Sequence, residues 1–198
     1  MKTRSKALLL TLCAVVLVVA TVFGTMAYLT STASVENTFT VGSVAITLDE
    51  KDITKTDGSR TTSNAYHLLP GHAYVKDPTV HVDGNSEDSW IFVKVENGIA
   101  AFEAASSADY KTIAEQITAN GWMALDGVAG VYYKAYSKAA ATTDLVVFEN
   151  FQMAEDANEV NGWSSISADT TKVTVTAYAV QKDGFDTAKA AWDATFGK

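Results

Sequence analysis

Short segments with alternating side chains, separated by turn residues, constrain the fold of this chain most. The clearest of them puts Ile91, Val93 and Val95 on one face and Trp90 and Phe92 on the other. Successive side chains of a strand point to opposite faces of a sheet, so each such run predicts a strand. Strands are expected over residues 37–48, 74–82 (interrupted at Pro78), 90–96, 122–125, 131–136, 145–151 and 172–181.

Two segments change to a helical period. Apolar side chains in residues 108–119 fall on one stripe that ends at Asn120-Gly121, and residues 185–196 have a similar stripe. Seven or eight short strands with turns between them, plus two short helices, predict a mainly β fold. The expected architecture is an antiparallel β-sandwich.

The first predicted strand changes face part-way along. Its apolar residues are Phe39 and Val41 before Gly42-Ser43, and Val44, Ile46 and Leu48 after them. Because a strand keeps one parity on each face, the switch at Gly42 indicates a bulge or kink. Such a segment can lie across two sheets, or cross from one subunit to the next.

The N-terminus has the three-part layout of a secretory signal peptide. Lys2, Arg4 and Lys6 precede an apolar run over residues 7–23, and small residues follow at 24–27. We expect cleavage between Ala27 and Tyr28, which leaves residues 28–198 as one domain. An uncleaved anchor is the alternative, because the apolar run approaches the ~18 residues of a membrane span.

Charge and cysteine content exclude several classes of function. The formal net charge is -8, and losing the three basic residues of the signal, with no acidic one, makes it -11. A domain with this much negative charge repels nucleic acid and anionic lipid. Membrane contact is therefore expected only through the signal segment. Cys13, the only cysteine, lies in the signal segment, so the exported part has no disulfide and no thiolate chemistry.

The residues that could bind a metal lack the spacing of a known site. A zinc protease needs two His one helical turn apart with Glu between them. Here His67 and His72 flank Leu-Leu-Pro-Gly, and His81 falls in the segment that contains Pro78. The sequence therefore predicts no catalytic residue, no metal site and no cofactor.

Two further groups have both a functional and a structural interpretation. Acidic and amide side chains before Trp90 could bind calcium or form a solvated hairpin turn. Aromatic side chains on two strands could bind sugars or pack in the core. The acidic group is Asp83, Asn85, Glu87 and Asp88, and the aromatic group is Trp90, Phe92, Tyr132, Tyr133 and Tyr136.

Several motifs resemble those of the TasA/camelysin family. At the N-terminus they are Gly24-Thr25-Met26-Ala27-Tyr28-Leu29-Thr30, Asn37-Thr38-Phe39-Thr40-Val41-Gly42 and Val44-Ala45-Ile46-Thr47-Leu48. Leu69-Pro70-Gly71 followed by Lys76 resembles the next element of that family. The run 179–185, leading into Ala191-Trp192, resembles a C-terminal ending of proteins that depend on a SipW-type signal peptidase.

The resemblance implies a jelly-roll-like sandwich exported by a Gram-positive bacterium and processed by that peptidase. It implies a structural protein of the biofilm matrix or cell surface, not an enzyme, that self-associates or joins other matrix proteins. In fibres of this family the N-terminal strand of one subunit completes the sheet of the next, so residues 28–41 are the expected donor strand. Alternatives are a monomeric surface or adhesion module, in which this segment is the protein's own first strand, and a camelysin-type metalloprotease.

Overall fold

The computed structural model describes residues 5–8, 10–17, 43–140, 142–160, 162–166 and 171–197. The chain divides into two units, residues 1–40 and 41–198. In the first unit, residues 5–8 and 10–17 are helical and expose apolar side chains, Leu8, Leu10 and Leu12 among them. None of the helices in the described ranges has the length and hydropathy needed to cross a membrane.

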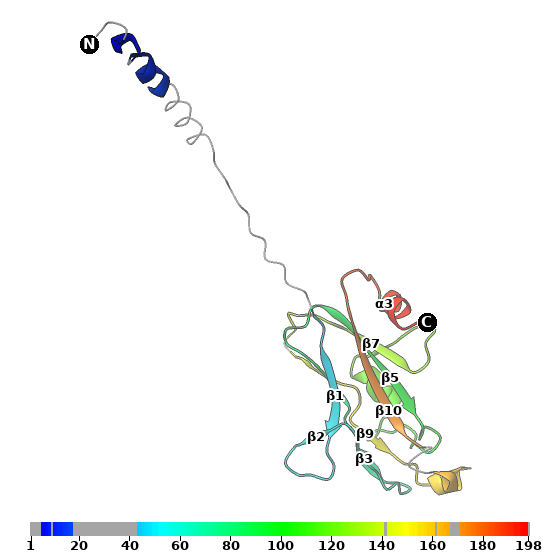
Figure 1. The fold of residues 1–198 in the computed structure, drawn as a ribbon. Helices are drawn as coiled ribbons and strands as arrows, with labels where there is room; N and C mark the ends of the chain where they lie inside the picture. Colours follow the sequence, from blue (N-terminus) through cyan, green and yellow to red (C-terminus); the bar gives the residue numbers. More distant parts are fainter. Residues whose placement is uncertain are drawn as a thin grey trace. The chain divides into compact units, whose positions relative to one another are not determined.

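The second unit is mainly antiparallel β structure with a few short helices, as the sequence predicts (Figure 1). Its strands are β1 (Ile46–Lys51), β2 (Arg60–Thr61), β3 (Ala73–Val75), β4 (Thr79–Val82), β5 (Ser89–Asn97), β6 (Met123–Ala124), β7 (Val131–Tyr136), β8 (Asp144–Val146), β9 (Asn150–Gln152) and β10 (Val173–Gln181). Its helices are α2 (Ile113–Ala119), α3 (Ala188–Thr195) and the 3-10 turns η1 (Ala157–Glu159) and η2 (Trp163–Ser165).

The strands form two four-stranded sheets and one short ladder. One sheet has the order β2-β1-β4-β8, the other has the order β10-β5-β7-β6, and β3 pairs with β9. β5 is the centre of the second sheet, paired antiparallel with β10 over nine residues and with β7 over six. The sheet order leaves β10 at an edge.

Two apolar clusters hold the unit together. The larger joins the facing sides of the two four-stranded sheets and includes Val80 on β4 and Ile91 and Val93 on β5, all fully buried. The smaller lies on the opposite face of β5, where Phe92 packs with Trp192 of α3. The division of β5 between these clusters confirms the two faces predicted from its alternation.

Four predicted elements need correction. The strand expected over 74–82 is two strands, β3 and β4, which belong to different sheets on either side of Pro78. The helix expected over 108–119 begins only at Ile113, because Thr112 and Glu115 form a capping box that fixes its start. The strand expected over 145–151 is two strands, β8 and β9, which belong to different sheets. Of the strand expected over 37–48, residues 46–48 belong to β1, and the proposed kink at Gly42 lies outside the described residues.

Candidate functional site

The long edge of β10 is an open strand edge. β10 pairs with β5 on one side, and no described strand pairs with its other side. Natural edge strands are commonly protected by charged residues, proline or a bulge. The sequence of β10, VTVTAYAVQ, contains no charge and no proline, and it pairs with β5 without a break in register. Its outer backbone groups are therefore suited to bind a further strand.

The face of β10 that points between the sheets is only partly covered. Val173, Val175, Ala177 and Ala179 alternate on this face, and all four are half-buried against the larger cluster. Thr174 and Thr176, between them, are exposed on the other face. The inward face thus has apolar surface that an added strand would cover.

β1 lies opposite β10 in the facing sheet. β4 pairs with it along Ile46–Asp49, whereas β2 pairs with it only at Glu50 and Lys51. β1 and β10 belong to different sheets and lie side by side (Figure 1). We call the junction of the two strands, with Ile46 and Leu48 of β1 on one side and the four inward residues of β10 on the other, the open seam.

The predicted assembly residues divide between described and undescribed parts of the chain. Ile46 and Leu48 pack partly buried against the chain's own larger cluster, and Val44 is half-buried just before β1. Phe39 and Val41 lie outside the described residues, as do the expected cleavage residues Ala27 and Tyr28. The second half of the predicted assembly segment is thus anchored in its own domain.

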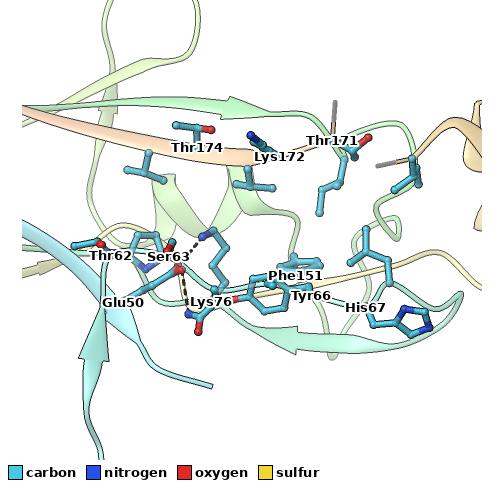
Figure 2. A pocket seen from close by; sticks show the side chains of 18 of the residues that line it. Glu50, Thr62, Ser63, Tyr66, His67, Lys76, Phe151, Thr171, Lys172 and Thr174 are labelled. Carbon is cyan, nitrogen blue, oxygen red and sulfur yellow. Dashed lines mark hydrogen bonds and ion pairs between the residues drawn. The ribbon is translucent and has the colours of Figure 1, made fainter. Parts of the chain in front are cut away.

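A cavity of about 810 Å³ lies at the end of the seam where β10 begins (Figure 2). Its apolar walls include Leu48, Phe151 and Trp163, and its rim includes the first residues of β10. Volumes of ~300–1,000 Å³ are typical of pockets that bind small ligands. The cavity therefore offers room for a bulky side chain or a small molecule.

A buried polar cluster lies in the cavity wall. Glu50 has the same parity on β1 as Ile46 and Leu48, so its carboxylate points inward. Its Oε2 accepts a hydrogen bond from Lys76 Nζ at 2.6 Å, and its Oε1 accepts one from Asn64 Nδ2 at 3.0 Å. The side chains of Glu50 and Lys76 are only 6% and 12% exposed. Burial, with the Glu50 charge nearby, raises the pKa of Tyr66 above its ordinary value.

A second polar cluster, which we call the outer cluster, lies on the opposite face of β1. His81 Nδ1 is 2.7 Å from Asp144 Oδ1, and His81 Nε2 is 2.9 Å from Asp49 Oδ1. Arg60 pairs with both Asp49 and Asp77. Burial opposes the charge of His81, but the hydrogen bonds with Asp144 and Asp49 outweigh it and raise the pKa of the imidazole above 6.5.

The three histidines considered as metal ligands lie in three different places. His81 is in the outer cluster just described, His67 lines the cavity, and His72 lies in the turn before β3. The described ranges contain no group of three or more His, Cys, Asp or Glu side chains arranged to hold a metal ion.

The acidic turn is held by hydrogen bonds to protein groups. Asp83 accepts a hydrogen bond from the backbone of Asn85, and Glu87 pairs with Lys138. Asp88 accepts hydrogen bonds from the Lys138 backbone and the Ser137 hydroxyl.

The aromatic side chains that could have formed a sugar platform pack in the two clusters. Trp90, Phe92 and Tyr136 are buried, and Tyr132 and Tyr133 are partly buried. Trp90 meets Tyr133 edge to face, with ring centroids 5.9 Å apart. This arrangement favours the packing interpretation of these residues.

Comparison of the chain with protein-family models, curated proteins and solved structures gives no significant match.

Two features of the site lie outside the sequence predictions, namely the buried polar cluster and the open edge of β10. Glu50 is not among the predicted site residues, although an acidic residue in phase with Ile46 and Leu48 signals an inward charge that needs a partner. The absence of charge from 173–181 was also a signal, because an exposed edge is usually protected.

Proposed function

We propose that this chain is an exported structural protein of the biofilm matrix or cell surface with a jelly-roll-like sandwich. It assembles when residues 28–41 of one copy pair with the open edge of β10 in the next. The observation that carries the proposal is the uncharged, nine-residue edge of β10 beside half-buried apolar side chains. Unpaired N–H and C=O groups along such an edge bind an extended segment through main-chain hydrogen bonds.

The composition of residues 28–41 suits a donor strand. The segment is rich in Thr and Val, and its only charged residue is Glu36. Such residues favour strands, and a nearly uncharged segment adds little repulsion between two acidic copies.

Apolar side chains of the donor would fill the seam. Phe39 and Val41 share a parity, so both can point to one side of an added strand. Burying one such side chain stabilises a complex by ~1.5–3 kcal/mol, and the ladder of backbone hydrogen bonds sets its register. The anchoring of Ile46 and Leu48 in their own domain leaves the preceding residues to reach a neighbour.

Export is the other half of the proposal. Residues 5–8 and 10–17 are helical and mostly apolar, in keeping with the hydrophobic part of a signal peptide. A SipW-type signal peptidase would cut between Ala27 and Tyr28. N-terminal sequencing of the secreted protein should then begin Tyr-Leu-Thr-Ser, and retention of residues 2–23 would contradict this part of the proposal.

Assembly is tested on the donor side with the secreted protein at increasing concentration. Electron microscopy should show filaments for the natural chain. Deletion of residues 28–38 together with Phe39→Asp should leave a folded monomer. If the altered chain unfolds, the segment is its own first strand and the monomeric surface or adhesion module is the better description. If it polymerises normally, this donor segment is wrong.

The acceptor side has a matched pair of variants. Val175→Lys places a charge on the inward face of β10, whereas Thr176→Lys places one on the exposed opposite face. We expect the first variant to prevent filaments and the second to permit them, with circular dichroism showing that both are folded. Equal loss of filaments in both would contradict binding at the inward face.

A further inference from the structure

The buried cluster of Glu50, Lys76 and Asn64 contains every group needed for an amide cross-link between two side chains. Lys76 has a primary amine, Asn64 has a carboxamide, and Glu50 touches both nitrogens with different oxygens of one carboxylate. We propose that Lys76 and Asn64 become joined by an isopeptide bond, formed by the protein itself with Glu50 as the proton carrier.

Glu50 is positioned to move protons between the two nitrogens. Lys76 Nζ lies 2.6 Å from Oε2, and Asn64 Nδ2 lies 3.0 Å from Oε1. Figure 2 shows the carboxylate of Glu50 and the amine of Lys76 at the wall of the cavity. A general base within hydrogen-bond distance can remove the proton that keeps an amine from attacking, and then supply it to the leaving group.

The carboxamide of Asn64 is held in one orientation. Its Oδ1 accepts a hydrogen bond from the Ile53 N–H at 3.1 Å, and its Nδ2 also donates to the Lys51 carbonyl at 2.8 Å. These contacts keep Nδ2 toward Glu50. The Ile53 N–H is also positioned to stabilise the negative charge that develops on Oδ1 when Cγ is attacked.

The surroundings limit access of competing water. The Glu50 side chain is 6% exposed and that of Lys76 is 12% exposed. The ring of Tyr66 lies on one side of Lys76, with its centroid 5.9 Å from Nζ. Shielding of the carboxylate and the amine from water strengthens the electrostatic contact between them.

The chemistry balances without a further reactant. Lys76 gives a proton to Glu50, and Nζ attacks Cγ of Asn64, so that a new C–N bond forms. Glu50 returns a proton to Nδ2, the Cγ–Nδ2 bond breaks, and the nitrogen leaves as ammonia, which takes the remaining proton of the lysine ammonium. Nothing is oxidised or reduced.

The bond would have a structural consequence. It would join the end of the loop that contains β2 to the link between β3 and β4. Both segments line the cavity. A domain without a disulfide would thus gain a covalent tie beside its open seam.

Peptide mapping by mass spectrometry of the purified protein tests the proposal. Trypsin cuts after Arg60, Lys76 and Lys94, so an unlinked chain gives a fragment of residues 61–76 that contains both partners. An acylated Lys76 is not cut. The expected product is therefore a fragment of residues 61–94 whose mass is lower by one ammonia. Complete release of fragment 61–76 at its full mass overturns the proposal.

Loss of ammonia alone is not sufficient. A succinimide at Asn64 would lose the same mass but would leave cleavage after Lys76 intact, and that result also contradicts the cross-link. Tandem fragmentation should show the joined side chains directly. The natural chain decides the question even if no variant folds.

Four variants refine the assignment. Lys76→Arg keeps the cation but cannot form the bond, so the fragment that contains Asn64 should keep its full mass, with no loss of ammonia. Asn64→Asp should give a linked fragment of the same mass as the natural chain, because water leaves instead. The Glu50→Gln chain should be folded by circular dichroism, and its fragment with Asn64 and Lys76 should not lose the mass of ammonia. Normal linkage in this variant would overturn the role of Glu50. Lys111→Arg changes an exposed lysine elsewhere and should leave the linkage unchanged.

Discussion

The two faces of β10 differ in how the chain covers them. On one face Tyr178 contacts Trp192 and Phe196, with ring centroids 5.5 Å and 4.9 Å apart, so α3 covers the second half of β10 there, while Thr174 and Thr176 stay exposed. On the other face Val173 and Val175 are only half-buried beside a cavity of about 810 Å³. α3 thus covers Tyr178 and Val180 on one face, whereas on the other face the first residues of β10 border the cavity.

The largest expected effect is a difference in unfolding free energy between substitutions on the central strand β5 and on the edge strand β10. Val93 on β5 and Ala177 on β10 are direct cross-strand partners on the inward face, but Val93 is fully buried and Ala177 is half-buried. Val93→Asp should lower the free energy of unfolding by more than ~4 kcal/mol, because it buries an unpaired carboxylate. Ala177→Asp should cost less than ~1 kcal/mol in the monomer, since water reaches the edge.

Urea unfolding followed by fluorescence measures both changes in the natural and altered chains. Equal losses for Val93→Asp and Ala177→Asp would mean that the inward face of β10 is already covered within the monomer. That result would remove the difference between the two faces of β10.

The part of the sheet under α3 should respond strongly to loss of an aromatic side chain. Trp192 is 8% exposed and contacts Phe92 as well as Tyr178. Trp192→Ala should lower the free energy of unfolding by ~3–5 kcal/mol, because it leaves a cavity under α3. Ala190→Ser, at an exposed position of the same helix, should change it by no more than ~0.5 kcal/mol. Similar effects of the two would show that α3 contributes little to the fold.

The smallest effect is a pH dependence from the outer cluster. Hydrogen bonds with Asp144 and Asp49, which outweigh burial, raise the pKa of His81 above 6.5 in the folded chain. Protonated His81 therefore stabilises the fold below the unfolded pKa, and this contribution disappears as the pH rises through the folded pKa. His81→Gln should cost ~0.5–1 kcal/mol more near pH ~5.5 than near pH ~8.5.

Thermal unfolding at both pH values, compared between the natural chain and His81→Gln, measures this difference. A loss that is the same at both pH values would mean that His81 acts by packing and not by charge.

Local patterns predicted the elements that depend on local rules. The alternation of residues 90–96 gave the correct two faces of β5, and Pro78 marks the interruption between β3 and β4. The division of 145–151 into β8 and β9 was not predictable, because Val147 and Phe148 are both fully buried and give no alternation. The start of α2 was readable in principle from Thr112 and Glu115, three residues apart.

The sequence by itself determined the period of each element, the net charge and the lack of cysteine after residue 13, since each is a property of neighbouring residues or of composition. Only the tertiary structure decided which strand lies at an edge and which side chains meet. Glu50, Asn64 and Lys76 come from different segments, and sheet order alone leaves β10 without a second partner in the described chain. Contacts between distant segments depend on packing and register, which no local periodicity specifies.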